Sequence, residues 1–142
     1  MTKTVHIPLV LFLLAGVGCK SISFSTQTSS ENGYKQKVAF ETVYYEANKQ
    51  MVLNNKENAL GLYHEAIVLD PKSHATMYQL AKLYYQANKS NEALYWAEKA
   101  VAQSPYNHWF SGQLGQFYSK YGKYPESANM FAQMVNAEPE EK

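Results

Sequence analysis

The residues of this 142-residue chain that could perform chemistry are few and scattered. Three of the four histidines, His64, His74 and His108, lie far apart, and Asp70 is the chain's single aspartate. A catalytic or metal site needs several such groups at a characteristic spacing, and no such motif is present. We therefore expect a protein that is not an enzyme and that uses no metal and no cofactor. An enzyme or ligand carrier would require His74, His108 and Lys82 to cluster, which helical spacing does not suggest.

The charged residues disfavour a nucleic-acid partner. All 13 basic residues are Lys, and 12 acidic residues balance them to a net charge of +1. The guanidinium groups that bind phosphates and bases in a bidentate manner are absent, and no excess positive charge draws a polyanion. We expect no nucleic-acid binding.

Residues 1–18 have the layout of a secretory signal peptide. Lys3 gives a basic start, an apolar stretch follows from residue 8 to residue 17, and small residues precede Cys19. The apolar stretch is shorter than the ~20 residues that a membrane-spanning helix needs. Cleavage is therefore expected before Cys19, the only cysteine, so that the mature chain has no disulfide.

Cys19 resembles the lipid-acceptor cysteine of bacterial lipoproteins. The resemblance implies a lipid on this thiol and attachment to the bacterial cell envelope, with the protein facing the periplasm. Lys20 stands where an aspartate marks inner-membrane retention in some bacteria, so the outer membrane is favoured. The alternative is an unmodified thiol after an ordinary signal peptide, which would leave a soluble periplasmic or secreted protein.

The segment 19–37 differs in composition from the rest of the chain. It is rich in Ser, Thr and Gln and poor in apolar residues, so it cannot bury enough surface to offset the entropy of ordering. This composition predicts a flexible tether. The residues from 38 to 139 form the predicted domain, and 140–142 a short tail.

A repeat of 34 residues organises the domain. Pro71, Pro105 and Pro139 recur at this period, each at the end of an apolar stretch. Small residues recur within the units at positions where two helices can approach closely: Ala47, Ala59 and Ala66, then Ala81, Ala93 and Ala100. The apolar spacing has the period of a helix, and no strand pattern competes with it.

From residue 40 to residue 139 the chain resembles the tetratricopeptide-repeat (TPR) family. The resemblance implies an all-α solenoid of three helical hairpins, six antiparallel helices in all, with units at about 40–73, 74–107 and 108–139. Three positions depart from the family pattern: Glu46 occupies a usually apolar site, Ser127 replaces the usual Ala, and Met134 stands at the last small position of unit three.

Local residue types predict where several helices begin and end. Ser73 and Asn107 are suited to cap the first helices of units two and three, and Ser90 to cap a second helix. Gly122 is suited to end a helix, and Pro125 fits the first turn of the next one.

The resemblance also implies that the first helix of each unit lines a concave groove. Its groove positions fall on Tyr44, Tyr45 and Asn48 in unit one, Tyr78, Gln79, Lys82, Tyr85 and Gln86 in unit two, and Trp109, Gln113, Gln116 and Lys120 in unit three. Aromatic and amide side chains suit an extended or helical polypeptide. The remaining large aromatics are expected in the core: Tyr84, Tyr95, Trp96, Tyr118 and Phe131.

These observations predict a protein-interaction module or scaffold, tethered to the envelope and acting in envelope assembly or secretion. TPR arrays usually finish with a solvating helix, and this sequence stops soon after its third unit. Two alternatives follow: the chain self-associates through its uncapped C-terminal hairpin as a homo-oligomer, or it is the front of a longer TPR protein.

Overall fold

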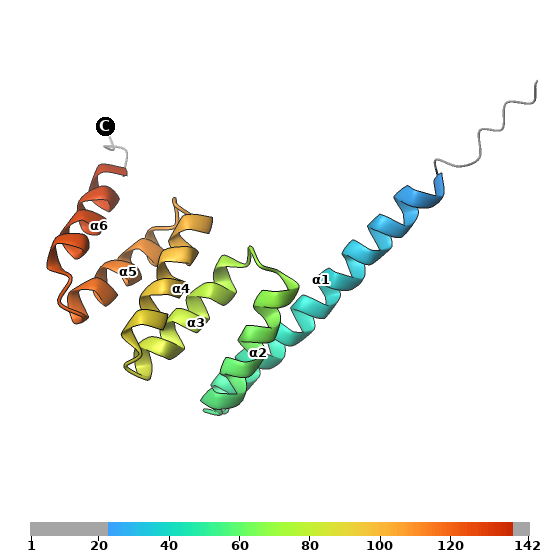
Figure 1. Cartoon of the computed structure of the whole chain (residues 1–142), viewed down its shortest axis with the longest axis horizontal. Coiled ribbons are helices and arrows are strands. Elements are labelled where there is room, and N and C mark those ends of the chain that lie inside the picture. The colour runs from blue at the N-terminus through green and yellow to red at the C-terminus, as the bar shows by residue number, and fades with distance from the viewer. Residues whose placement is uncertain (1–22, 138–142) are drawn as a thin grey trace, which may run out of the picture.

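The computed structural model describes residues 23–137, which form an array of six helices (Figure 1). In chain order these are α1 (Ser23–Val52), α2 (Lys56–Leu69), α3 (His74–Gln86), α4 (Ser90–Gln103), α5 (His108–Lys120) and α6 (Tyr124–Ala137). Consecutive helices pair as the hairpins α1/α2, α3/α4 and α5/α6, and successive hairpins stack through α2 on α3 and α4 on α5. The described residues contain no strand. The expected all-α solenoid of three helical hairpins is confirmed.

Small residues bring the two helices of each hairpin together. Ala47 and Ala59 are fully buried in the first hairpin, as are Ala81 and Ala93 in the second. In the third hairpin the corresponding residues are Gly115 and Ser127, and the Ser127 hydroxyl donates a 2.8 Å hydrogen bond to the Gly115 carbonyl. The serine that departs from the repeat pattern is therefore buried with its polar atom satisfied.

The three hairpin turns have the same backbone conformation. Asn54, Asn88 and Gly122 stand one repeat apart and adopt φ angles of 61°, 57° and 75°. After each of them, the next backbone amide donates to the carbonyl five residues earlier at 2.9 Å. These bonds satisfy carbonyls that the helix end would otherwise leave unpaired. The prediction that Gly122 ends a helix is confirmed.

Two of the three predicted helix caps are present. The Ser73 hydroxyl accepts from the Thr76 amide at 3.2 Å, and the Asn107 side chain accepts from the Trp109 and Phe110 amides at 3.1 and 3.3 Å. Ser90 was expected to cap α4, and this prediction is wrong. Ser90 is the first residue within the helix, and Lys89 takes the cap position without a side-chain hydrogen bond.

The hairpins stack through apolar residues that recur at the repeat period. Leu80 of α3 is fully buried against residues of the first hairpin, including Tyr63, and Leu114 of α5 is buried against the second. Tyr118 of α5 donates to the Glu98 carboxylate of α4 at 2.8 Å, and burial together with this bond raises the Tyr118 pKa to about 12. Successive hairpins thus share continuous apolar contacts.

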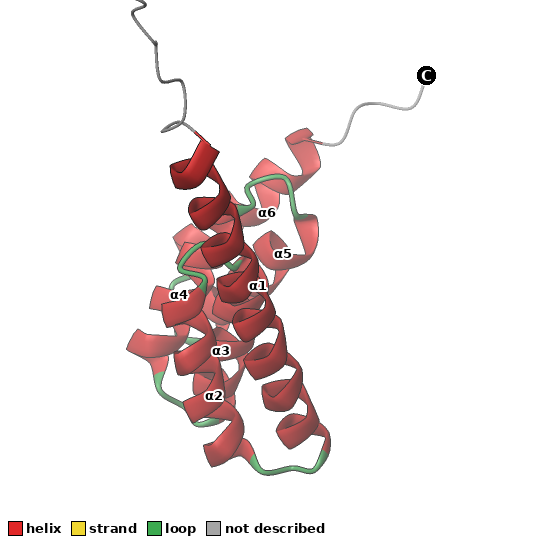
Figure 2. Cartoon of the chain, turned by 90° about the vertical axis from the view of Figure 1, so that its right-hand side faces the viewer, coloured by secondary structure: helices red, strands yellow, loops and turns green. Residues whose placement is uncertain are grey.

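The first helix is much longer than the others and extends beyond its hairpin (Figures 1 and 2). The composition of 19–37 predicted a flexible tether, but α1 is already helical at Ser23. For residues 23–37 the prediction of a flexible chain is therefore wrong. Cys19 and the predicted signal peptide lie outside the described residues.

Local contacts explain why the helix continues through this polar segment. There is no proline between Ser23 and Val52, so no residue interrupts the backbone hydrogen bonds. Exposed pairs of Lys35 with Glu31 at 2.7 Å and Lys37 with Glu41 at 3.9 Å add modest support, and the Gln36 amide donates to the Leu69 carbonyl of α2 at 2.7 Å. Once the packed part of α1 has formed, each further residue extends an existing helix and needs no new nucleation.

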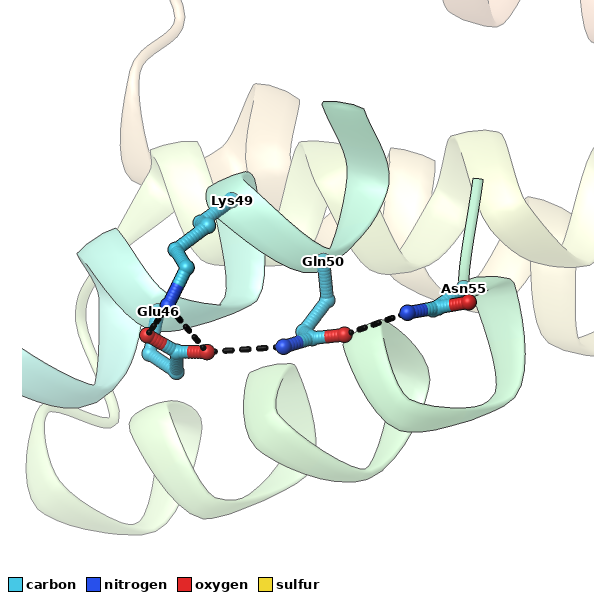
Figure 3. A network of polar contacts seen from close by, with 4 residues as sticks. All are labelled: Glu46, Lys49, Gln50 and Asn55. Carbon is cyan, nitrogen blue, oxygen red and sulfur yellow. Dashed lines mark hydrogen bonds and ion pairs between the residues drawn. The ribbon is translucent and has the colours of Figure 1, made fainter. Parts of the chain in front are cut away.

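A polar network occupies the outward side of α1, where a preceding hairpin would stack (Figure 3). Glu46 accepts from Lys49 at 3.1 Å and from Gln50 at 2.7 Å, and Gln50 in turn accepts from Asn55 at 2.9 Å. The hydrogen bond from Gln50, followed by that from Lys49, lowers the Glu46 pKa. Glu46 stands at the repeat position of the buried Leu80. The unusual glutamate thus makes this end of the array polar.

We predict opposite effects for two Gly→Ala substitutions. Neither residue has an atom within 4 Å of an added Cβ, but Gly122 has φ +75° and Gly61 is helical. Gly122→Ala should lower the free energy of unfolding by ~1 kcal/mol because of the left-handed backbone. Gly61→Ala should raise it by about 0.5–1 kcal/mol through helix propensity. Urea unfolding measures both, and equal stability of the two variants would contradict the account of the turn.

Candidate partner-binding surface

The predicted groove residues lie on α1, α3 and α5, but they differ in accessibility. Trp109 is 64% exposed, and Tyr45, Lys82, Gln86, Gln116 and Lys120 are also exposed. The others are partly buried: Tyr44, Asn48, Tyr78, Gln79, Tyr85 and Gln113. Register alone therefore does not determine which of these side chains can meet a partner.

Two of the predicted groove tyrosines join α3 to α5. The Tyr78 ring stacks on Phe110 with 5.2 Å between ring centroids, and the Tyr85 ring stacks on Phe117 at 4.2 Å and an interplanar angle of 15°. Such pairs stabilise packed helices beyond the area that they bury. Tyr78 and Tyr85 therefore pack between hairpins while remaining partly exposed, and their contact with a partner stays a prediction.

Lys120 makes a cation–π contact with the Tyr85 ring. The Lys120 ammonium lies 3.9 Å from the centroid of the Tyr85 ring, and it donates to the Tyr85 carbonyl at 3.3 Å and to the Asn88 side chain at 3.0 Å. Phe117, Tyr85 and Lys120 thus form a continuous contact from α5 to the end of α3. This arrangement orders Lys120, which sequence register also placed in the groove.

In unit one the groove residues Tyr44 and Asn48 are likewise used within the fold. Tyr44 stacks on Phe40 at 5.7 Å and lies 5.9 Å from the Tyr63 ring. Asn48 donates to the Tyr44 carbonyl at 2.7 Å and accepts from the Tyr63 hydroxyl at 2.9 Å. Burial raises the pKa of Tyr63, whose side chain is fully enclosed. Asn48 therefore satisfies a buried hydroxyl within the fold, and its contact with a partner stays a prediction.

Five of the accessible groove positions define what we call the first-helix face. It comprises the exposed or partly exposed side chains of Tyr45, Gln79, Lys82, Trp109 and Gln116 on α1, α3 and α5. Tyr45 and Trp109 are 70% and 64% exposed. Two aromatic side chains, two amides and one ammonium group are therefore accessible on these first helices.

The helices α3 and α5, which carry most of the first-helix face, have charged side chains of one sign only. Neither His74–Gln86 nor His108–Lys120 contains an acidic residue, and each contains one lysine. Acids occur instead on all four other helices, for example Glu65, Glu98 and Glu126 on α2, α4 and α6. A partner segment with carboxylates is therefore favoured over a basic one on this part of the surface.

A second group of aromatic residues involves the second helices α2, α4 and α6 together with Tyr84 of α3 and Tyr118 of α5. His64 of α2 lies 2.8 Å from the Tyr84 hydroxyl and packs against Trp96 of α4, and burial lowers the His64 pKa. The expected core residues Tyr84, Trp96 and Tyr118 are partly buried against the core. Tyr95 and Phe131 are 49% and 40% exposed, so their placement in the core was wrong.

Residues 23–137 contain neither a metal-binding cluster nor a helix that could span a membrane. Between residues 23 and 137, no three residues among His, Cys, Asp and Glu come close enough together to hold a metal ion. The histidines lie apart: His64 contacts Tyr84, His74 packs 5.5 Å from the Phe110 ring, and His108 is exposed. None of the described helices has the length and apolar content to cross a membrane.

Concave space of side-chain size occurs between α4, α5 and α6. A hollow of about 120 Å³ is lined by Val101, Pro105, Tyr106, His108, Ser111, Met130, Gln133 and Met134. Its apolar floor could accept one side chain of a partner, but it lies beside the first-helix face and includes none of its residues. Sequence register gave no signal for this hollow, because its lining comes from three helices and a loop.

Comparison with known proteins identifies the fold. No protein-family model and no curated protein matches the chain in sequence. Among solved structures, MamA protein is similar at 20% identity and a TM-score of 0.64, over 68% of this chain and 53% of that one. The TPR domain of Sgt2 from Aspergillus fumigatus is 19% identical with a TM-score of 0.62, over 70% of this chain and 66% of that one. The TPR domain of P58(IPK) is 24% identical with a TM-score of 0.64, over 72% of this chain and 29% of that one.

These likenesses show that the chain has the TPR fold, as its repeat period predicted. The match spans about half of that MamA chain and less than a third of the P58(IPK) structure.

We predict that two aromatics on neighbouring first helices differ in their effect on stability. Tyr85→Ala should lower the free energy of unfolding by ~2 kcal/mol, because it removes the stack on Phe117 and the contact with Lys120. Trp109→Ala should change it by less than ~0.5 kcal/mol, because that side chain is largely in solvent. Thermal and urea unfolding distinguish the two variants. If Tyr85→Ala left the free energy of unfolding unchanged, the packing role of Tyr85 would be contradicted and its assignment to the groove favoured.

Proposed function

We propose that the chain is a non-catalytic scaffold that binds a polypeptide segment of another protein across its first-helix face. The observation that carries the proposal is the exposure of Tyr45 and Trp109 on the first helices of units one and three. Both rings provide large contact area with few rotatable bonds, so ordering them on binding has a small entropic cost.

The polar residues of the face define what the segment should contain. Gln79 and Gln116 can each donate to and accept from a peptide backbone, which suits an extended or helical segment. Lys82 is exposed on α3, which has no acidic residue, so a carboxylate of the segment can pair with it. We infer an aromatic-contacting segment with at least one acidic group as the ligand.

The scaffold itself is rigid where the segment would lie. The stacks of Tyr78 on Phe110 and Tyr85 on Phe117 fix α3 against α5 without using any residue of the first-helix face. A surface held in place before binding loses less entropy on association. Here the tyrosines support recognition by fixing the helices.

Partner capture should depend on the exposed aromatics. The full chain with a C-terminal affinity tag is used to isolate binding proteins from detergent-solubilised envelope, and captured proteins are identified by mass spectrometry. The double variant Tyr45→Ala/Trp109→Ala should lower the yield of a specific partner at least tenfold, with unchanged helicity. Tyr34→Ala is the matched control, because this tyrosine is 69% exposed but lies on α1 about three turns before Tyr45. Equal capture by wild type and double variant would refute the first-helix face.

We further propose that the scaffold is anchored to the cell envelope through a lipid on Cys19 and acts there in envelope assembly or secretion. The proposal is supported by the signal-like residues 1–18 and by the single cysteine that follows them. Because α1 begins at Ser23, the array would follow the anchor on a helix. An outer-membrane location facing the periplasm is the corresponding proposal for localisation.

Metabolic labelling with an alkyne analogue of palmitate tests the anchor. The wild-type chain should incorporate the label and partition with membranes, because the lipid would bring a large apolar area to the protein. Cys19→Ser should lose both the label and membrane partitioning. A labelled Cys19→Ser variant, or an unlabelled wild type, would contradict the anchor while leaving the first-helix face untouched.

A further inference from the structure

An apolar stripe runs along the outward side of α6, the last described helix. We call Tyr124, Ala128, Phe131 and Val135 the α6 stripe; the spacings of four, three and four residues keep them on one side of the helix. All four are exposed, with Tyr124 at 68%, Phe131 at 40% and Val135 at 73%. Figure 1 shows α6 at the end of the array, and no described helix lies beyond it.

The earlier units show what this side of a second helix contacts. Ala128, Phe131 and Val135 correspond, two repeats earlier, to Leu60, Tyr63 and Ile67 in α2 and, one repeat earlier, to Leu94, Ala97 and Val101 in α4. Tyr124 corresponds to the polar residues Lys56 and Ser90. In α2 the apolar residues pack against Leu80, Leu83 and Met77 of α3, and in α4 they pack against Leu114 and Phe117 of α5. In both units, an apolar first helix of the next hairpin covers the side of the second helix that corresponds to the α6 stripe. The geometry therefore assigns a helix as the occupant of the α6 stripe.

The opposite end of the array does not offer such a helix. At the positions of Leu80, Leu83 and Tyr84, α1 carries Glu46, Lys49 and Gln50, which bond to one another. Stacking α6 of one copy on α1 of the next would remove these two charges from water without apolar contacts in return. Head-to-tail growth of the array is thereby disfavoured.

We propose that the α6 stripe pairs with the α6 stripe of a second copy, antiparallel and about a two-fold axis. The order of residues is self-complementary in this arrangement. Tyr124 meets Val135 of the second copy and Ala128 meets its Phe131, so each ring faces a smaller side chain. A two-fold pair uses the same patch on both copies and therefore closes at two.

The surroundings of the stripe support a copy of itself as the partner. Glu126 is the only charged residue in α6, and it is not a member of the stripe. The residues that flank the stripe on both sides, Pro125, Ser127, Ala132 and Met134, are uncharged. Pairing two such helices buries no charge and brings no like charges together at the contact.

The close contact of Phe131 with its own hairpin also fits this arrangement. A Cβ placed on Gly115 would come within 2.8 Å of the Phe131 ring, so the ring lies directly on the α5 backbone. Its inner side is held in place by the hairpin, and its outer side remains in solvent. Phe131 is thus a fixed ring that can receive Ala128 of the second copy without first becoming ordered.

The size of the contact sets its strength. A helix of 14 residues is ~21 Å long and buries less than the ~800 Å² per partner of a standard stable interface. The dimer should therefore form and dissociate with concentration. Because the first-helix face lies on other helices, the dimer would present two such faces and could bind a divalent partner with added avidity.

Light scattering after size exclusion tests the pairing. The full chain, in one detergent at fixed concentration, should shift from the mass of one chain toward that of two over a hundredfold rise in protein concentration. Val135→Glu should abolish the shift, because it places a charge in the stripe. Val68→Glu is the matched control, because that valine is 75% exposed on α2 and should leave the shift intact. A shift unchanged by Val135→Glu, masses beyond two chains, or no shift in the wild type would each refute the proposal.

Disulfide trapping tests the direction of the pair in a Cys19→Ser background. The double variant Tyr124→Cys/Val135→Cys should form cross-linked dimers under mild oxidation, because these positions meet across the axis. Tyr124→Cys alone should remain uncross-linked, since the two copies of that position would lie ~16 Å apart along the helices. Efficient cross-linking of the single variant, or none of the double variant, would overturn the antiparallel arrangement.

Discussion

The architecture depends on the close approach of the two helices within each hairpin. At the contact the first helix offers Ala47, Ala81 or Gly115, and the second offers Ala59, Ala93 or Ser127. Larger side chains at these positions would separate the helices and disturb the apolar surfaces that meet the next hairpin. Stacking of the hairpins, the stacked rings between α3 and α5, and the exposure of the first-helix face all follow from this contact.

The repeat produces two ends that are chemically different. The positions that receive a preceding hairpin are apolar in α3 and α5 but polar in α1, where Glu46 is held by Lys49 and Gln50. The positions that contact a following hairpin remain apolar in α6. The polar residues of α1 need no partner, whereas the apolar residues of α6 gain from one. A departure from the repeat pattern that weakens the sequence signal at Glu46 thus has a structural reason.

Much of the fold could be predicted from the sequence, because period, small residues and caps are local signals. The 34-residue spacing, the buried alanines and the caps at Ser73 and Asn107 all have direct counterparts in the structure. The extent of α1 was not predictable from composition, because a helix supported by packing can continue into a polar segment.

The candidate site was less predictable, because register gives the direction of a side chain but not its contacts. Tyr85 and Asn48 stand at groove positions, yet each contacts a residue distant in the sequence. Tyr85 stacks on Phe117, and Asn48 accepts a hydrogen bond from Tyr63. The left-handed turns at Asn54 and Asn88 were missed because asparagine is a weaker signal than glycine for that backbone.

The continuity of α1 also links the length of its projecting part to the orientation of the whole array. Because one helix spans both the projecting residues and the first hairpin, any change of length in the projection turns the whole array about the helix axis. One added residue rotates it by ~100°, whereas four added residues come close to a full turn and nearly restore the original direction. The number of residues in the projecting part of α1 therefore determines the direction of the first-helix face relative to whatever holds the start of α1.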